Sequence, residues 1–181
     1  RVLALGCGSG ALLPELASDS TFTEILGVDV STRALEAASR RLERLPEHQR
    51  TRVGLRQSAL TYLDPDLRGY DAAVLMEVIE HVDPERLPAL QRAVFGVARP
   101  RTVVVTTPNV EYNERFPGLP EGALRHPDHR FEFTRAQFRD WGERIAREHE
   151  YSARFLPVGP EDPDVGAPTQ LAVFTAEEVS T

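Results

Sequence analysis

Short hydrophobic runs alternate along the chain with amphipathic, helix-like segments. Most runs are apolar throughout, as expected of strands that are buried on both faces of a sheet. The predicted strands are 2–6, 24–30, 51–57, 70–76, 101–108, 152–158 and 170–176, and the predicted helices are 10–17, 31–45, 77–98 and 134–149. This order predicts an α/β fold, a doubly wound and mostly parallel sheet that ends in an antiparallel strand pair.

Two segments interrupt the alternation. Residues 109–130 have no hydrophobic period and are rich in Pro, Gly, Asn, His and charge. A loop of this length inside a compact domain usually has a function. Residues 159–168 are rich in Pro, Gly and Asp and link the last two strands. Ser31 and Thr134 are the predicted N-caps of the helices that follow them.

The composition fits a single globular domain over residues 1–181, with 41% hydrophobic and 27% charged residues. The hydrophobic runs are too short to cross a membrane. A lone cysteine, Cys7, excludes an intrachain disulfide, which fits a cytoplasmic location. Because the first residue already stands in a predicted strand, we expect this domain to be the C-terminal part of a longer protein.

The charge limits the nucleic acids that the chain can bind. The net charge is −7, and all 21 basic residues are arginine. Sequence-independent binding along a nucleic acid needs many neutralised phosphates. Any contact with RNA should therefore be local, with a few arginines at one end of a strand.

A glycine-rich loop follows the first predicted strand. Gly6, Gly8 and Gly10 allow a sharp turn and close approach of a ligand, and the next helix offers unpaired N–H groups. Asp29 ends the second strand, where a carboxylate can accept hydrogen bonds from the hydroxyls of an adenosine ribose. The pattern therefore predicts an adenosine-containing cofactor.

The spacing of the glycines does not decide which adenosine-containing cofactor binds. It resembles the first motif of class I methyltransferases, but Gly6, Gly8 and Ala11 also fit a dinucleotide pattern. Cys7 lies inside the loop as a small space-filling residue. Ser58 follows the third strand, where methyltransferases usually cover the adenine, although it also suits a simple turn.

Candidate metal ligands follow the fourth strand in the sequence EVIEH. Glu77, Glu80 and His81 would share one face of the helix predicted there, at the sheet edge where doubly wound folds bind ligands. Metal-free methyltransferases that act on small molecules have similar sequences at this place. EVIEH alone therefore does not establish a metal.

A second group of histidines strengthens the prediction of a metal. His126 and His129 lie in RHPDHRFEFTR, at the end of the aperiodic loop. Carboxylates combined with imidazoles suit Mn²⁺, Co²⁺ or Fe²⁺ better than Mg²⁺, and Zn²⁺ also stays open.

EVIEH, TTPNVEYN and RHPDHRFEFTR occur in this order and resemble the bacterial Hen1-type RNA 3′-terminal ribose methyltransferases, relatives of plant and animal small-RNA methyltransferases. The resemblance covers nearly the whole chain. It implies a Rossmann-like fold, S-adenosylmethionine as methyl donor, and Glu77, Glu80, His81 and His129 as ligands of a divalent metal. It also implies His126 or His81 as the base; Phe133 departs from the tryptophan usual in the motif.

The resemblance further implies the substrate and the partners. The substrate would be the 2′-hydroxyl at an RNA 3′ end, as in cleaved tRNA under repair, and the partner a polynucleotide kinase–phosphatase. The residues themselves suggest RNA contacts. Arg125, Arg130 and Arg135 flank the histidines and could grip terminal phosphates, while Tyr112 and Phe131 could stack on the last base. The arginines suit solvent or ion pairs equally well, and the rings suit the core.

Three alternatives stay open at this point. The first is a metal-free methyltransferase that acts on a small molecule. The second is an inactive module that binds adenosine, because Ala4 stands where methyltransferases commonly have an acidic residue. The third is an NAD oxidoreductase, although no motif of the chain resembles a hydride-transfer site.

Overall fold

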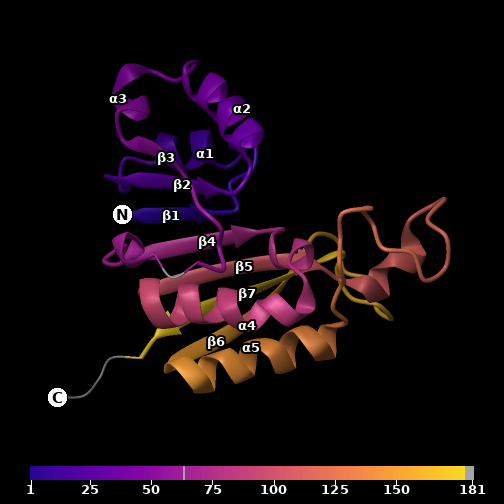
Figure 1. Ribbon diagram of the computed structural model, residues 1–181. Helices are drawn as coiled ribbons and strands as arrows, with labels where there is room; N and C mark the ends of the chain where they lie inside the picture. Colours follow the sequence, from indigo (N-terminus) through magenta and orange to yellow (C-terminus); the bar gives the residue numbers. More distant parts are fainter. Residues whose placement is uncertain (63, 178–181) are drawn as a thin grey trace.

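A computed structural model describes residues 1–62 and 64–177, and these form one seven-stranded sheet with helices on both faces (Figure 1). The strand order is β3-β2-β1-β4-β5-β7-β6. The strands are β1 (Val2–Leu5), β2 (Ile25–Asp29), β3 (Val53–Gln57), β4 (Ala72–Met76), β5 (Thr102–Pro108), β6 (Tyr151–Val158) and β7 (Thr169–Ala176).

The first five strands pair in parallel, whereas β7 is antiparallel to both β5 and β6. The order reverses at β1, so the chain winds outward from the centre in both directions. The α/β fold with a closing antiparallel pair, predicted from the sequence, is confirmed. Ligands bind at such a reversal point in folds of this type.

Alternate residues of β1 pack into two hydrophobic cores. Leu3 and Leu5 belong to the larger cluster, which α4, η4 and α5 cover, whereas Val2 and Ala4 belong to the smaller one beneath α1 and α2. The strand is apolar throughout because helices bury both of its faces.

The two longest helices are α2 (Thr32–Leu42) and α5 (Arg135–His149). The other helical segments are α1 (Leu13–Ser18), α3 (Glu47–Arg50), η1 (Pro65–Leu67), η2 (Ile79–His81), η3 (Pro84–Arg86), α4 (Leu87–Gln91), η4 (Arg92–Ala98) and η5 (Val110–Arg115). Both predicted N-caps are confirmed. Ser31 accepts a hydrogen bond from Ala34 N, and Thr134 forms a reciprocal capping box with Gln137.

The predicted helix over 77–98 is wrong in its first part. Glu77 has a left-handed backbone with φ of 53°, and its N–H donates to the carbonyl of Thr106 on β5. The chain thus follows β5 for one more residue and then turns through the short η2. The turn buries Ile79 and Glu80, which an amphipathic helix starting at Glu77 would not achieve together.

The predicted helix over 10–17 begins later, at Leu13, because Gly8 and Gly10 have positive φ and belong to the loop. The aperiodic segment 109–130 contains only the short η5 and projects beyond the sheet (Figure 1). No helix in the described ranges is long and apolar enough to cross a membrane.

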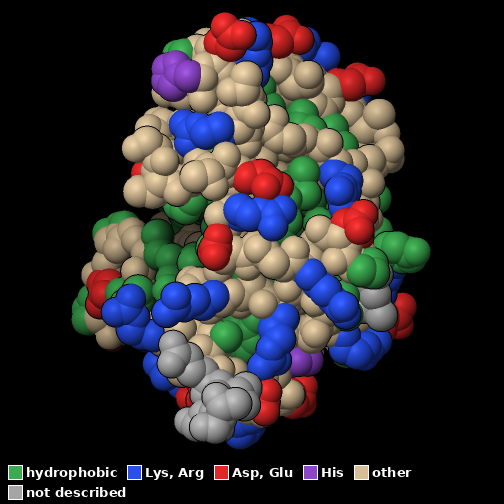
Figure 2. All heavy atoms as spheres, turned by 90° about the vertical axis from the view of Figure 1, so that its left-hand side faces the viewer, with side chains coloured by type: hydrophobic (Ala, Val, Ile, Leu, Met, Phe, Trp, Pro, Cys, Tyr) green, Lys and Arg blue, Asp and Glu red, His purple; other side chains and the backbone are tan. Residues whose placement is uncertain are grey.

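The face of the molecule where the strands begin shows arginine and acidic side chains intermixed (Figure 2). Arg1 pairs with Glu24 there, and Arg99 pairs with Glu150. The charges of these arginines are therefore neutralised locally, in keeping with the net charge of −7.

Candidate active site

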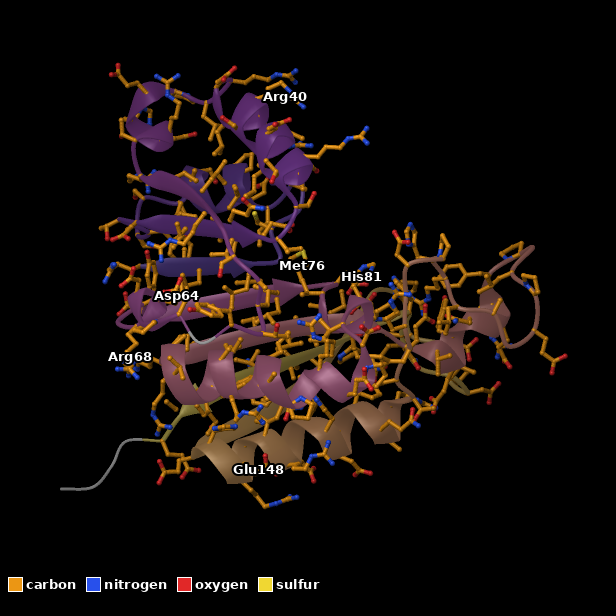
Figure 3. All side chains as sticks on the ribbon, viewed as in Figure 1. Arg40, Asp64, Arg68, Met76, His81 and Glu148 are labelled. Atoms are coloured by element: carbon orange, nitrogen blue, oxygen red, sulfur yellow. The ribbon has the colours of Figure 1, made fainter. Side chains whose placement is uncertain are left out.

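The candidate functional residues gather at the opposite edge of the sheet, where the parallel strands end. Figure 3 places Met76 and His81 there, at the end of β4, and Asp64 and Arg68 near the other edge. The base of the segment 109–130 lies beside His81. The site is therefore built from strand ends and one long loop.

The glycine loop and Asp29 form one hydrogen-bonded unit. The Asp29 carboxylate accepts from Gly8 N at 2.8 Å and from Ser31 N at 2.8 Å, one bond at each oxygen. Gly6 and Gly8 have φ of 70° and 52°. A Cβ at Gly6 would lie 2.7 Å from a Val78 methyl group, so the loop needs glycine there.

A cavity of about 470 Å³ opens between this loop and the turn after β4. It is of a size typical of ligand sites. Its described lining residues are Gly6, Gly8, Asp29, Val30, Ala59, Leu60, Thr61, Glu77, Val78, His81, Val82, Asp83 and Arg86. Three of the predicted adenosine-binding residues, Gly6, Gly8 and Asp29, thus share one cavity with two predicted metal ligands.

Three other predicted cofactor residues lie outside the lining of this cavity. Ser58 borders a separate, small cavity, and the three residues after it line the main one. Cys7 packs toward Gly27, and burial raises the pKa of its thiol to about 11. Gly10 lies against Ala38, where a Cβ would approach to 2.8 Å. Cofactor binding by these three residues stays a prediction.

Glu80, His81 and His129 converge, although they come from two distant segments. One potential ligand atom of each lies within 4.8 Å of the others. The rings of His81 and His129 are 4.8 Å apart, centre to centre. The loop thus brings His129 to the turn after β4, as the prediction of a joint metal site required.

Glu80 is fully buried, yet its carboxylate is only half satisfied. Oε2 accepts a hydrogen bond from Thr107 at 3.0 Å, whereas Oε1 has no partner among the described residues. Burial raises the pKa of Glu80 to about 7, and the nearby Glu77 adds to the shift. A bound cation would offset both the burial and the missing partner.

Both histidines use the same ring nitrogen, Nδ1, for a contact within the protein. His81 Nδ1 lies 3.3 Å from the carbonyl of Asp128, and His129 Nδ1 lies 2.6 Å from Glu132 Oε1. A carbonyl and a carboxylate can only accept, so each Nδ1 carries the proton and each Nε2 keeps its lone pair.

The other two candidates lie near this group. Glu77 is exposed, lines the cavity, and accepts a hydrogen bond from Thr106 at 2.9 Å. The ring of His126 is 5.6 Å from that of His129, and its Nδ1 accepts from Asp128 N. Neither belongs to the close group of three ligand atoms.

Most of the predicted RNA-binding residues are engaged within the protein. Arg125 is half-buried and donates to Asn113 and to a backbone carbonyl. Arg135 pairs with Glu111, and Phe131 packs against Phe133. These three side chains therefore already have partners within the protein, and their contact with RNA stays a prediction.

Arg130 and Tyr112 are freer. Arg130 is 56% exposed and makes a loose 3.5 Å pair with Asp83 on the rim of the cavity. Tyr112 is half-buried and lies edge-on to Phe116.

The donor set fits a divalent cation. Arg125 is influenced by three carboxylates, those of Glu77, Glu80 and Glu132, although burial lowers its pKa overall. These carboxylates outnumber the one guanidinium, and a divalent cation would offset their negative charge. Mixed carboxylate and imidazole donors also match the preference of Mn²⁺ and related ions.

The strand order, the glycine loop and Asp29 define a class I, Rossmann-like S-adenosylmethionine-dependent methyltransferase. In agreement, a family model described as a methyltransferase domain matches residues 3–104.

Proteins that align with higher sequence identity show which methyltransferase family this is. The methyltransferase domain of bacterial CtHen1-C has 49% sequence identity and a TM-score of 0.88, over 98% of this chain and 90% of that one. The chain therefore belongs to the Hen1 family of methyltransferase domains. The small RNA methyltransferase HEN1 matches with 30% identity and a TM-score of 0.89, over 99% of this chain and 23% of its own.

Curated relatives agree. The small RNA 2′-O-methyltransferase of Gallus gallus is 35% identical over all of this chain and 50% of its own length. That of Xenopus tropicalis is 34% identical over 97% of this chain and 49% of its own. The chain thus spans about half the length of these curated relatives.

Sequence reasoning missed the residues that support the ligands. Glu77 is hydrogen-bonded by Thr106 and Glu80 by Thr107, while His129 contacts Glu132. Their motifs, TTPN and DHRFEF, mark the segments, but no spacing in the sequence identifies these partners.

Proposed function

We propose that this domain transfers a methyl group from S-adenosylmethionine to the 2′-hydroxyl of the 3′-terminal nucleotide of RNA. A divalent cation, with Mn²⁺ preferred and Mg²⁺ or Co²⁺ as substitutes, is held by Glu77, Glu80, His81 and His129. The observation that carries the proposal is the common cavity, whose wall includes the glycine loop, Asp29 and His81.

Binding of the methyl donor depends on Asp29 and on the backbone N–H groups that hold its carboxylate. Gly8 N already holds one oxygen of Asp29, which leaves further lone pairs on the carboxylate for the two ribose hydroxyls. Val30, which is 65% exposed beside Asp29, offers an apolar surface for the adenine. Asp29 would hold the adenosine end, and Glu77 and His81, which line the same cavity, would face the methyl group to be transferred.

The acceptor side depends on ligands that range from the fully buried Glu80 to the exposed His81. Among the described residues Glu80 Oε1 has no partner, and the Nδ1 contacts of His81 and His129 leave their Nε2 atoms for the cation. The cation supplies charge that favours the alkoxide form of a ribose hydroxyl. Much of the rate then comes from holding the hydroxyl in line with the methyl group.

His126 is the proposed proton acceptor, and His81 is the alternative. The side chain of His126 is 53% exposed. Its Nδ1 accepts from Asp128 N at 3.2 Å, so His126 must give up this bond before it takes a proton at Nδ1. H126A is expected to lower kcat and to leave cation binding unchanged.

The RNA and its handling complete the proposal. Arg130 is placed on the rim to meet the terminal phosphate, and Tyr112 is a candidate for stacking on the last base. A role in repair of cleaved RNA such as tRNA and a polynucleotide kinase–phosphatase partner stay predictions from the family resemblance. A cytoplasmic location stays a prediction from the single cysteine.

A methylation assay with defined RNA 3′ ends tests the function. Otherwise identical oligonucleotides would end in 2′,3′-hydroxyls, a 2′-deoxyribose or a 3′-phosphate, with chelator and with added Mn²⁺. Transfer is expected only to the first RNA and only with the cation. Activity on all three ends, or full activity of H129A in chelator, would refute the proposal and favour a metal-free enzyme for another substrate.

A further inference from the structure

A buried carboxylate behind His129 is left without a role in the proposed reaction. Glu132 is 7% exposed, and its side chain has no exposed surface. Burying a carboxylate is costly unless hydrogen bonds hold it. The chain nevertheless places it three residues from His129, with its carboxylate against Nδ1 of that ring.

Hydrogen bonds hold the carboxylate of Glu132 against one atom, His129 Nδ1. Oε1 lies 2.6 Å from His129 Nδ1 and accepts from Arg125 N at 2.7 Å, while Oε2 accepts from Asn113 Nδ2 at 2.6 Å. Two loop residues thus fix the carboxylate. The carboxylate in turn fixes the tautomer and the rotation of the imidazole.

The two histidines are held unequally. His81 has only a neutral carbonyl behind it, at 3.3 Å, whereas His129 has a carboxylate at 2.6 Å. Hydrogen bonds to an ionised acceptor are shorter and about twice as strong as neutral ones. A carboxylate partner also makes the free Nε2 a stronger donor to a metal.

We propose that Glu132 is a positioning residue for the cation site, holding His129 with Nε2 turned toward Glu80 and His81. The proposal rests on the proposed function, because it assumes a cation between these ligands. Asn113 and Arg125 serve Glu132, so the network links the aperiodic segment to the metal.

Equilibrium binding of Mn²⁺, measured by calorimetry, tests this role without any turnover. E132A is expected to lose roughly 10–100-fold in affinity, as is typical when the partner of a metal-bound histidine is removed. E132Q keeps an acceptor oxygen for His129 and should recover part of the loss. The exposed loop residue Glu121 gives the matched control, and E121A should bind like the wild type.

A double-mutant cycle separates positioning from a general structural effect. If Glu132 acts through His129, H129A and the double variant H129A/E132A should bind Mn²⁺ equally weakly. Affinity for S-adenosylmethionine should stay within about twofold in all variants, because neither residue lines the cofactor cavity.

Two results would overturn the proposal: wild-type affinity for Mn²⁺ in E132A, or losses that multiply in the double variant. If E132A does not fold, the Mn²⁺ affinities of E132Q and of H129A/E132Q replace those of E132A and H129A/E132A in the same comparison. A wild-type protein that bound no Mn²⁺ would instead remove the proposed metal dependence, and this role with it.

Discussion

Replacing Glu80 by glutamine is expected to stabilise the metal-free protein. The carboxylate of Glu80 is fully buried, with one oxygen unpartnered, and its pKa rises from the ordinary 4.5 to about 7. At 1.36 kcal/mol per pKa unit, ionised Glu80 costs the fold about 3 kcal/mol above pH 7. An unpaired amide N–H₂ in E80Q costs about 1–2 kcal/mol. The net gain is about 1–2 kcal/mol.

The pH dependence follows from the raised pKa. A carboxyl group that is harder to ionise in the folded state destabilises the fold above its unfolded pKa. The penalty grows between pH 4.5 and about 7 and is constant above that. Urea unfolding in chelator should therefore show E80Q more stable than the wild type at pH 8, with the advantage gone near pH 4.5.

Adding Mn²⁺ should make the wild type more stable than E80Q. A ligand at 100 times its Kd stabilises the state that binds it by about 2.7 kcal/mol, and E80Q lacks the anionic donor. E121Q is the matched control, because Glu121 is exposed on the loop, away from Glu80, and its neutralisation should leave metal-free stability unchanged. Equal or lower stability of E80Q at pH 8 without metal would refute the reasoning.

Three further predictions concern the cofactor end. G10A should destabilise the fold by about 1–3 kcal/mol in thermal unfolding, because the new Cβ strains a positive φ and meets Ala38; a neutral result would contradict the packing. Cys7, with a pKa of about 11, should react with iodoacetamide far more slowly at pH 8 than free cysteine, as followed by mass spectrometry. D29N should weaken S-adenosylmethionine binding roughly 10-fold or more in calorimetry, since one carboxylate oxygen becomes an N–H₂ group that cannot accept from a ribose hydroxyl; unchanged affinity would contradict that placement.

The fold could be predicted because each strand is a local signal. Apolar runs such as that of β1 alternate with capped helices, and this pattern is sufficient to predict a doubly wound sheet. Ser31 and Thr134 also fixed the helix starts correctly, since a cap depends on neighbouring residues only. Shorter elements such as α3 and η5 depend on tertiary packing and were not predicted.

The sequence predicted the three residues that the structure brings together, Glu80, His81 and His129, but partly for a wrong reason. Glu80 and His81 were expected on a helical face, yet a left-handed Glu77 and a single short turn place them. Non-glycine residues rarely adopt positive φ, and no sequence signal announced it here. The two hydrogen bonds from Glu77 N to Thr106 give its physical cause.

The supporting residues could not be predicted, because their contacts cross the chain. Thr107 reaches Glu80 across 27 positions, and Asn113 reaches Glu132 across 19. Such pairs depend on the final register of strands and loops. The arginines show the reverse: Arg125 and Arg135 looked suitable for phosphates, but neighbouring carboxylates and carbonyls occupy them.

The central claim is that a cation lies between Glu80, His81 and His129, beside the methyl donor. Electron spin-echo spectroscopy of the Mn²⁺-loaded protein tests it directly, because it detects nitrogen bonded to manganese. We expect couplings from two imidazole nitrogens, reduced to one in H129A and unchanged in H126A. A wild-type spectrum without imidazole couplings, or one that H129A leaves unaltered, would contradict the account.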